Sequence, residues 1–168
     1  MVQRTSRRMT LLLSAVSLLL AATRRGWSQT AQAPELDTPK AKKIQALVEK
    51  AAQLVNSQGK VAFPEFHKKS SEWLTGDTYI FIFDMKGNEL VNGGFPNLEN
   101  TNVLELQDKT GKFLNKTFIA LLEKQDSGWV DYYFPKPGTS QIAKKWAFIK
   151  PVDFQGMQGG VGAGIYLD

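Results

Sequence analysis

Cysteine is absent from the 168 residues of this sequence, and histidine occurs only once, as His67. Without cysteine the chain has neither disulfide bonds nor a thiolate nucleophile. A zinc site needs several nitrogen or sulfur ligands, and a catalytic triad would depend on this one histidine. We therefore expect His67 to be a surface or helix-cap residue. We also expect the protein not to be an enzyme, and no metal or other cofactor to be bound.

Acidic residues are missing from the N-terminal end of the sequence, and arginine is missing from all that follows it. No acidic residue precedes Glu35, and no arginine follows Arg25. The five arginines are therefore all N-terminal. The remaining 16 of the 21 basic residues are lysines, and the 16 acidic residues balance their charge. This balanced region offers no concentrated basic surface for phosphates, so nucleic acid is not an expected partner.

A hydrophobic run long enough to span a membrane is missing as well. Residues 9–23 form an apolar run of 15 residues, whereas a spanning helix needs about 20. Arginines precede this run and small polar residues follow it, which is the anatomy of a signal peptide. We expect residues 1–33 to be a signal peptide for export to the periplasm or the medium. Residues 34–168 would then form one small domain.

Two features of this segment leave alternatives open. Arg7 and Arg8 partly match the twin-arginine export motif, but they also fit an ordinary charged signal region. Cleavage is expected after Ser28 or near Ala33, where Pro34 is unfavourable for signal peptidase. If the segment is not cleaved, the chain is instead a structural or interaction protein anchored to the membrane.

Helical periodicity follows the signal. Thr38 and Pro39 are typical of a helix start, and Ser57-Gln58-Gly59 is typical of its end. The apolar residues between them recur at helical spacing: Ile44, Leu47, Val48, Ala51, Leu54 and Val55. We expect two further helices, a short one over 63–73 and another with Phe113 and Phe118 on its apolar face.

Strand patterns fill most of the remaining chain. Residues 79–84 alternate Tyr79, Phe81 and Phe83 on one face with Ile80 and Ile82 on the other. Both faces are apolar, so helices or a cavity must cover the sheet on both sides. Further strands are expected at 89–91, 129–134, 144–149 and 161–167. This order predicts an α+β domain in which a long N-terminal helix packs on an antiparallel sheet of about five strands.

Several segments together resemble one family. They are Gly59–Phe63, Gly76–Asp84 with Gly87, Gly128–Tyr132, Pro135–Pro137, Lys145, Phe148–Val152 and Gly162–Tyr166. Their order and spacing resemble the type 2 single Cache domain, a PAS-like domain of extracytoplasmic sensors. The resemblance covers residues 40 to 168. It implies a module that binds a small carboxylate or similar metabolite and signals through a membrane receptor or sensor kinase. Because no output module follows Asp168, we expect this partner to be a separate protein.

Five residues are candidates for ligand binding: Tyr79, Phe81, Trp129, Tyr132 and Lys145. Aromatic residues in strands are most often core, but tyrosine hydroxyls and a mid-strand lysine are costly to bury without partners. A buried Lys145 needs an anion, either Asp131 or a ligand carboxylate. Since Lys145 alternates with Trp146 and Phe148, it could instead point to solvent. The sequence does not predict the ligand's identity, the partner or the oligomeric state.

Overall fold

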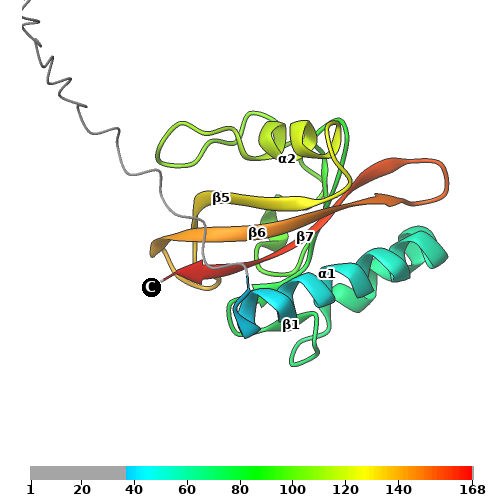
Figure 1. Ribbon diagram of the computed structural model, residues 1–168, viewed down its shortest axis with the longest axis horizontal. Helices are drawn as coiled ribbons and strands as arrows, with labels where there is room; N and C mark the ends of the chain where they lie inside the picture. The colour runs from blue at the N-terminus through cyan, green and yellow to red at the C-terminus, as the bar shows by residue number, and fades with distance from the viewer. Residues whose placement is uncertain (1–36, 168) are drawn as a thin grey trace, which may run out of the picture. The chain divides into compact units, whose positions relative to one another are not determined.

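The long N-terminal helix forms where the sequence predicts it. The computed structural model describes residues 37–167, and in it helix α1 spans Pro39–Gln58 (Figure 1). The side chain of Thr38 caps the helix by accepting a hydrogen bond from the backbone N–H of Ala41 at 3.1 Å. The helix ends at Gly59, whose φ of +61° is accessible to glycine without steric cost.

The predicted signal peptide and its export motif lie outside the described residues. Within residues 37–167, no helix is long and apolar enough to cross a membrane. The export route and the cleavage site therefore stay predictions.

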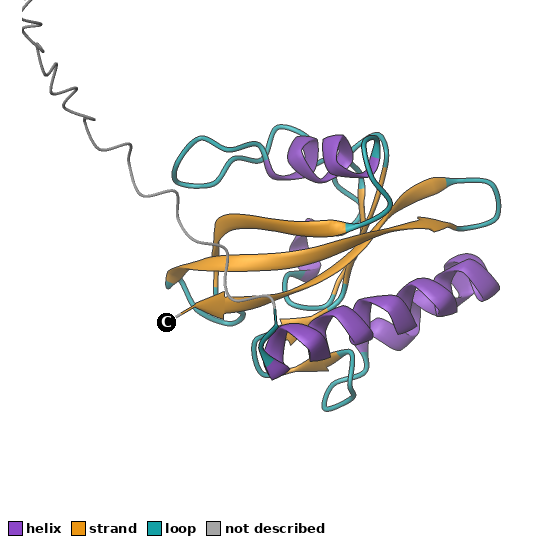
Figure 2. Cartoon of the chain, viewed as in Figure 1, coloured by secondary structure: helices purple, strands orange, loops and turns teal. Residues whose placement is uncertain are grey.

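Five strands form one sheet in the order β4-β3-β7-β6-β5, and every neighbouring pair is antiparallel. The strands are β3 (Phe81–Asp84), β4 (Glu89–Asn92), β5 (Gly128–Pro135), β6 (Ile142–Asp153) and β7 (Gln158–Leu167). Helix α1 lies on one side of this sheet, and helix α2 (Leu114–Leu122) lies on the other (Figure 2). This arrangement confirms the predicted α+β fold with five strands.

The chain between α1 and the sheet differs from the prediction. A 3-10 helix, η1, spans Gly59–His67, whereas the sequence predicts a short helix over 63–73. Pro64 lies inside η1 and has no N–H to donate, which disfavours a regular α-helix running from Gly59 through this residue. The Ser71 hydroxyl then donates to the Lys68 carbonyl at 2.6 Å and accepts from the backbone N–H of Trp73 at 3.2 Å. These local bonds compete with helix continuation.

A small second sheet divides the strand that the sequence predicts over 79–84. Strands β1 (Leu74–Thr75) and β2 (Thr78–Tyr79) pair with each other, and β3 begins only at Phe81. After β3, the Asp84 carboxylate accepts hydrogen bonds from the backbone N–H groups of Lys86 and Asn88, each at 2.9 Å. The Asp84 side chain therefore fixes the backbone of the turn between β3 and β4.

The two faces of the sheet carry separate clusters of buried side chains. On the α1 face, Ile80 and Ile82 join residues of α1 such as Val48 and Val55. On the α2 face, Tyr79, Phe81 and Phe83 join the following buried residues: Leu114, Phe118, Val130, Tyr132, Ala147, Ile149 and Tyr166. The predicted alternation along residues 79–83 and the coverage of both faces are confirmed.

Three glycines of β7 keep the α2 face open for large neighbours. A Cβ on Gly160 or Gly162 would lie 2.4 Å from the ring of Phe83 or Phe81, respectively. A Cβ on Gly164 would lie 2.5 Å from Cε of Lys145. The glycine-rich strand therefore gives space to side chains from neighbouring strands.

Candidate functional site

Lys145 is the charged residue at the centre of the α2 face. Its side chain has no solvent exposure, and Nζ has no hydrogen-bond or ion-pair partner within residues 37–167. In the sheet it lies between Tyr132 of β5 and Tyr166 of β7. Nζ is 3.9 Å from the ring centroid of Tyr79 and 5.0, 5.4 and 5.9 Å from those of Tyr166, Phe81 and Tyr132. The ammonium group therefore rests among aromatic rings, without an anion in contact.

Burial dominates the electrostatics of this lysine. Desolvation lowers the pKa of Lys145 to about 7, although the charges of Glu89 and Asp77 act to raise it. Desolvation also raises the pKa of Tyr79 and of Tyr132 well above the ordinary value. The phenols thus stay neutral hydrogen-bonding groups at neutral pH, while Lys145 lies close to its titration point.

A small cavity lies beside these residues. Its volume is about 20 Å³, enough for roughly one water molecule. Its walls include Tyr79, Phe81 and Tyr132, the same rings that contact Lys145, and three polar residues. The full lining is Tyr79, Phe81, Glu89, Asn92, Leu98, Val103, Leu106, Leu114, Asn115, Phe118, Tyr132 and Phe134. The cavity has mainly apolar walls with a few polar groups, as small-molecule sites do, but it is far smaller than the roughly 300 Å³ or more of a typical ligand pocket.

Glu89 provides the charge at the polar end of the cavity. It is only 4% exposed, and its Oε1 accepts a hydrogen bond from Nδ2 of Asn92 at 2.7 Å. Burial raises the pKa of Glu89 to about 8, while the Asn92 hydrogen bond and the charge of Lys145 act to lower it. Nδ2 of Asn115 in α2 has no hydrogen-bond partner among the described residues. The cavity wall therefore holds a buried donor and a carboxyl group that binds a proton near neutral pH.

A β-bulge turns Glu89 toward the cavity. Phe81 pairs with Asn92 and Ile82 with Val91, but Phe83 pairs with Glu89, so the register shifts by one residue at Leu90. Simple alternation would place Glu89 on the same face as Val91, which faces α1. The extra residue instead brings Glu89 to the α2 face. Nothing in the pattern of residues along this strand marks the bulge. The sequence therefore does not predict that Glu89 lies at the cavity.

Four of the five predicted ligand-binding residues come together in the structure. Tyr79, Phe81 and Tyr132 line the cavity on the α2 face, and Lys145 contacts these three rings from outside the cavity wall. Trp129 lies on the opposite face, where its ring centroid is 5.3 Å from that of Phe148. Trp129 and Tyr132 are three positions apart in β5, so their side chains leave opposite sides of the strand. The structure does not bring Trp129 to the cavity.

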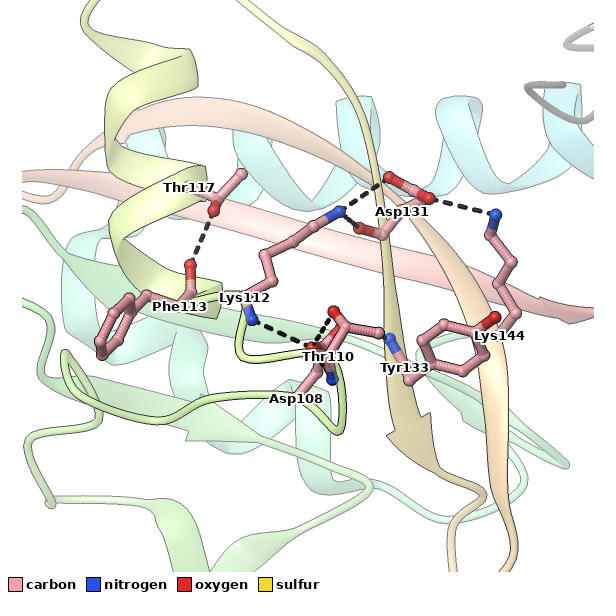
Figure 3. Close-up of polar contacts among 8 residues, drawn as sticks. All are labelled: Asp108, Thr110, Lys112, Phe113, Thr117, Asp131, Tyr133 and Lys144. Atoms are coloured by element: carbon pink, nitrogen blue, oxygen red, sulfur yellow. Dashed lines mark hydrogen bonds and ion pairs between the residues drawn. The ribbon is translucent and has the colours of Figure 1, made fainter. Parts of the chain in front are cut away.

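Asp131 does not balance the charge of Lys145. Its carboxylate oxygens lie 2.9 Å from Nζ of Lys112 and 3.1 Å from Nζ of Lys144 (Figure 3). Asp108 accepts a hydrogen bond from the backbone N–H of Tyr133 at 3.1 Å, so the turn that precedes α2 is attached to the edge strand β5. The sequence suggests either Asp131 or a ligand carboxylate as the anion for Lys145. In the structure Asp131 pairs with Lys112 and Lys144 instead.

Metal and histidine chemistry find no support in the described part of the chain. Within residues 37–167, no group of three or more His, Asp or Glu side chains could hold a metal ion. His67 lies in the last turn of η1, with Nδ1 3.2 Å from the carbonyl oxygen of Phe63 and Nε2 2.6 Å from Oε1 of Glu99. Its side chain is 37% exposed. The predicted surface or helix-cap position of His67 is confirmed.

An antiparallel sheet with a long N-terminal helix on one face and a small cavity on the other is a PAS-like arrangement. The chain belongs to the Cache domain family, because the model of that family matches residues 40–168. The resemblance noted in the sequence is thereby confirmed.

Two curated relatives are sensory proteins. The chain is similar to the methyl-accepting chemotaxis protein McpP of Pseudomonas putida, with 29% identity over 92 residues. It is also similar to the sensor histidine kinase MctS of Rhizobium johnstonii, with 35% identity over 92 residues. Each alignment covers 55% of this chain but only 16% of McpP and 19% of MctS. The chain thus matches a minor part of each relative.

Solved structures show the same fold. A periplasmic sensor domain of a chemotaxis protein matches with a TM-score of 0.68 and 26% identity, over 77% of this chain and 96% of that domain. A Cache chemosensory domain, described as a structural basis for carboxylic acid recognition, matches with a TM-score of 0.66 and 22% identity, over 77% and 94% of the two chains. At 22% sequence identity, this second match is evidence for a shared fold alone.

Proposed function

We propose that this chain is an exported sensing domain that binds a small organic carboxylate at Lys145. The observation that carries the proposal is the complete burial of this lysine, with no anion in contact within residues 37–167. Removing an ammonium group from water costs several kcal/mol unless an anion and hydrogen bonds replace the water. Aromatic contacts replace only part of that hydration. A ligand carboxylate on Nζ would supply the missing charge.

Tyrosine hydroxyls provide the neutral part of the site. The hydroxyl oxygens of Tyr79 and Tyr166 are 3.3 Å apart, and the Tyr166 hydroxyl donates to the carbonyl of Pro135 at 2.6 Å. The hydroxyl of Tyr79 is thus positioned by protein contacts on the same face as Lys145. Because Tyr166 donates its only proton to Pro135, the Tyr79 hydroxyl donates to Tyr166 in this structure. It would have to turn from Tyr166 to the ligand to bind one carboxylate oxygen beside the ammonium group of Lys145.

A surface groove offers a route to the cavity. This groove has a volume of about 340 Å³, and it shares Leu98, Leu106 and Phe134 with the cavity wall. Small movements of these three side chains would connect the two spaces. Because the inner cavity has room for roughly one water molecule, it would have to widen to admit even acetate, and we expect ligands of only a few heavy atoms.

The sensing role is supported by the family and by the receptor and kinase relatives. We expect a membrane receptor or sensor kinase to supply the signalling output, and residues 1–33 to direct export. The neighbour described for carboxylic acid recognition shares the fold. We choose a carboxylate for this chain because Lys145 is buried without an anion. We propose Lys145, Tyr79, Phe81 and Tyr132 as its ligand-binding residues.

Thermal unfolding with a panel of small molecules tests this function. The panel contains formate, acetate, propionate, lactate, pyruvate and succinate, with methylamine and ethanol as non-acidic controls. At 100 times its dissociation constant, a ligand adds about 2.7 kcal/mol to the free energy of unfolding. We expect stabilisation by one or more carboxylates and by neither control.

Two variants locate the effect. Lys145→Met keeps the apolar stem and removes the charge, so stabilisation by the carboxylate should disappear. Lys144→Met is the matched control, because Lys144 is the next residue and pairs with Asp131 instead. If no carboxylate stabilises the parent protein, or if Lys145→Met binds as tightly as the parent, the proposed function is wrong.

A further inference from the structure

Glu89 presents a charge problem for any anion that enters the cavity. Its carboxyl group is 4% exposed and lines the same 20 Å³ cavity as Tyr79, Phe81 and Tyr132, the rings that surround Nζ of Lys145. If Glu89 and the ligand were both ionised, two carboxylates would face one buried ammonium group. Like charges that share a low-dielectric site raise each other's proton affinity, as in carboxylate pairs that hold one proton between them.

We infer that Glu89 is a ligand-recognition residue that acts in its acid form, so that the cavity binds a carboxylate together with a proton. The inference rests on the proposed carboxylate function and names a requirement for it. In the bound state, the charged pair would be Lys145 and the ligand, while Glu89 is neutral. The domain would thus respond to carboxylate concentration and to acidity at the same time.

Burial of Glu89 favours the neutral acid. The hydrogen bond that Nδ2 of Asn92 donates acts in the opposite direction, and Oδ1 of Asn92 accepts from the backbone N–H of Phe95 at 2.9 Å. Glu99 accepts a hydrogen bond from the backbone N–H of Asn92 at 2.6 Å, and its negative charge disfavours ionisation of Glu89. His67 lies beyond Glu99, at 2.6 Å from its Oε1.

The other elements packed around Glu89 bring few charges. Strand β6 contributes Lys145, whose positive charge favours the ionised form. Strands β2 and β5 contribute the phenols of Tyr79 and Tyr132, and α2 contributes the neutral amide of Asn115. The amide groups of Asn92 and Asn115 and the charge of Lys145 therefore oppose protonation of Glu89. A ligand carboxylate that pairs with this lysine would offset the contribution of the lysine.

Proton uptake can be counted without any substitution. The pKa of Lys145 is about 7 and that of Glu89 about 8, so both groups have mostly lost their protons in the free protein at pH 8.5. Calorimetric titration with acetate and propionate at pH 8.5, in two buffers of different ionisation enthalpy, gives the protons taken up per ligand. We expect more than one proton, because Lys145 alone accounts for at most one. An uptake of one proton or fewer overturns the inference.

Glu89→Gln identifies the second group, since the amide is a neutral analogue of the acid. From the pKa of about 8, the acid form of Glu89 is about one in eleven molecules at pH 9. The variant should therefore bind acetate or propionate about tenfold more tightly than the parent at pH 9, and equally at pH 6.5. Glu105→Gln is the control, because it removes a carboxylate that is 72% exposed on the surface.

The outcomes separate this inference from the proposed function. If the parent binds neither acid at pH 6.5, the carboxylate function fails for these probes and the inference fails with it. If the parent binds but Glu89→Gln shows the same pH dependence as the parent, only the role of Glu89 is wrong. Weaker binding by Glu89→Gln at both pH values also overturns the inference, since it would show that the ionised form binds the ligand.

Discussion

The two faces of the sheet are built from different kinds of side chain. The α1 face buries a hydrophobic cluster that includes Val48, Val55 and Ile82 and carries no buried charge among residues 37–167. The α2 face buries Lys145 and Glu89 among aromatic rings. Burying apolar surface stabilises a fold, whereas burying unpaired charge destabilises it. The α1 face therefore stabilises the domain. The α2 face lowers its stability, and a bound ligand can offset that loss.

The contrast appears within single strands. In β6, Lys145 and Ala147 face α2, while Trp146 and Phe148 face α1. Strand β7 places glycines on the α2 face, so that this face has room for long side chains from its neighbours. Alternation along a strand thus lets one short segment serve both stability and recognition.

The largest effect is expected on the α1 face. Ile82 has no solvent exposure, and Ile82→Ala should lower the free energy of unfolding by about 2 to 5 kcal/mol, through lost apolar burial and a cavity. Urea denaturation measures this loss. Binding of a carboxylate by the folded fraction should stay unchanged. A loss below about 0.5 kcal/mol would mean that the α1 face is not the stabilising one.

On the α2 face, stability should depend on pH in two opposite ways. The pKa of Glu89 is raised from 4.5 to about 8, so the folded state binds more protons than the unfolded state, and stability falls as pH rises from 4.5 to 8. The pKa of Lys145 is lowered from 10.5 to about 7, so stability rises with pH from 7 to 10.5. The ligand-free domain should be least stable between pH 7 and 8.

Each limb of this profile has a slope of at most about 1.4 kcal/mol per pH unit for one proton. Glu89→Gln should remove the fall below pH 8, and Lys145→Met should remove the rise above pH 7. Urea denaturation of the parent and both variants from pH 5 to 10 measures the slopes. A parent profile with a maximum between pH 7 and 8 would contradict the assigned burial of both groups.

The smallest effect is expected at Asp131, outside the site. Its side chain and that of Lys112 are each 34% exposed, and such ion pairs contribute at most about 1 kcal/mol. Asp131→Asn should therefore destabilise the domain by no more than this amount and leave carboxylate affinity unchanged, as calorimetry would show. A large loss of affinity would mean that Asp131 and its lysines support Lys145 after all.

Periodicity and alternation predicted most of the fold. The spacing of apolar residues located α1, and the two apolar faces of residues 79–84 required covers on both sides of the sheet. The sequence also put Lys145 opposite Trp146 and Phe148, although alternation alone left open whether it met solvent or a cavity. The same alternation would have separated Trp129 from Tyr132, had it been applied to β5.

The rest depended on features that have no local pattern. The bulge at Leu90 brings Glu89 into the cavity, and it is set by pairing with β3 rather than by residues 89–92 themselves. The 3-10 helix over Gly59–His67 and the small β1-β2 sheet are short, so their bonding competes with several local alternatives. Long-range contacts, such as those of Asp131 with Lys112 and Lys144, also follow from the folded arrangement alone.

The most direct test is the titration of Lys145 itself. Nuclear magnetic resonance of protein with isotope-labelled lysine reports the protonation of each Nζ, and Lys145→Met assigns its signal. We predict a pKa of about 7 for Lys145 in the ligand-free domain and a rise of that pKa when acetate or propionate is bound, since an anion stabilises the ammonium group. A pKa of Lys145 at the ordinary value, unchanged by either carboxylate, would contradict the account.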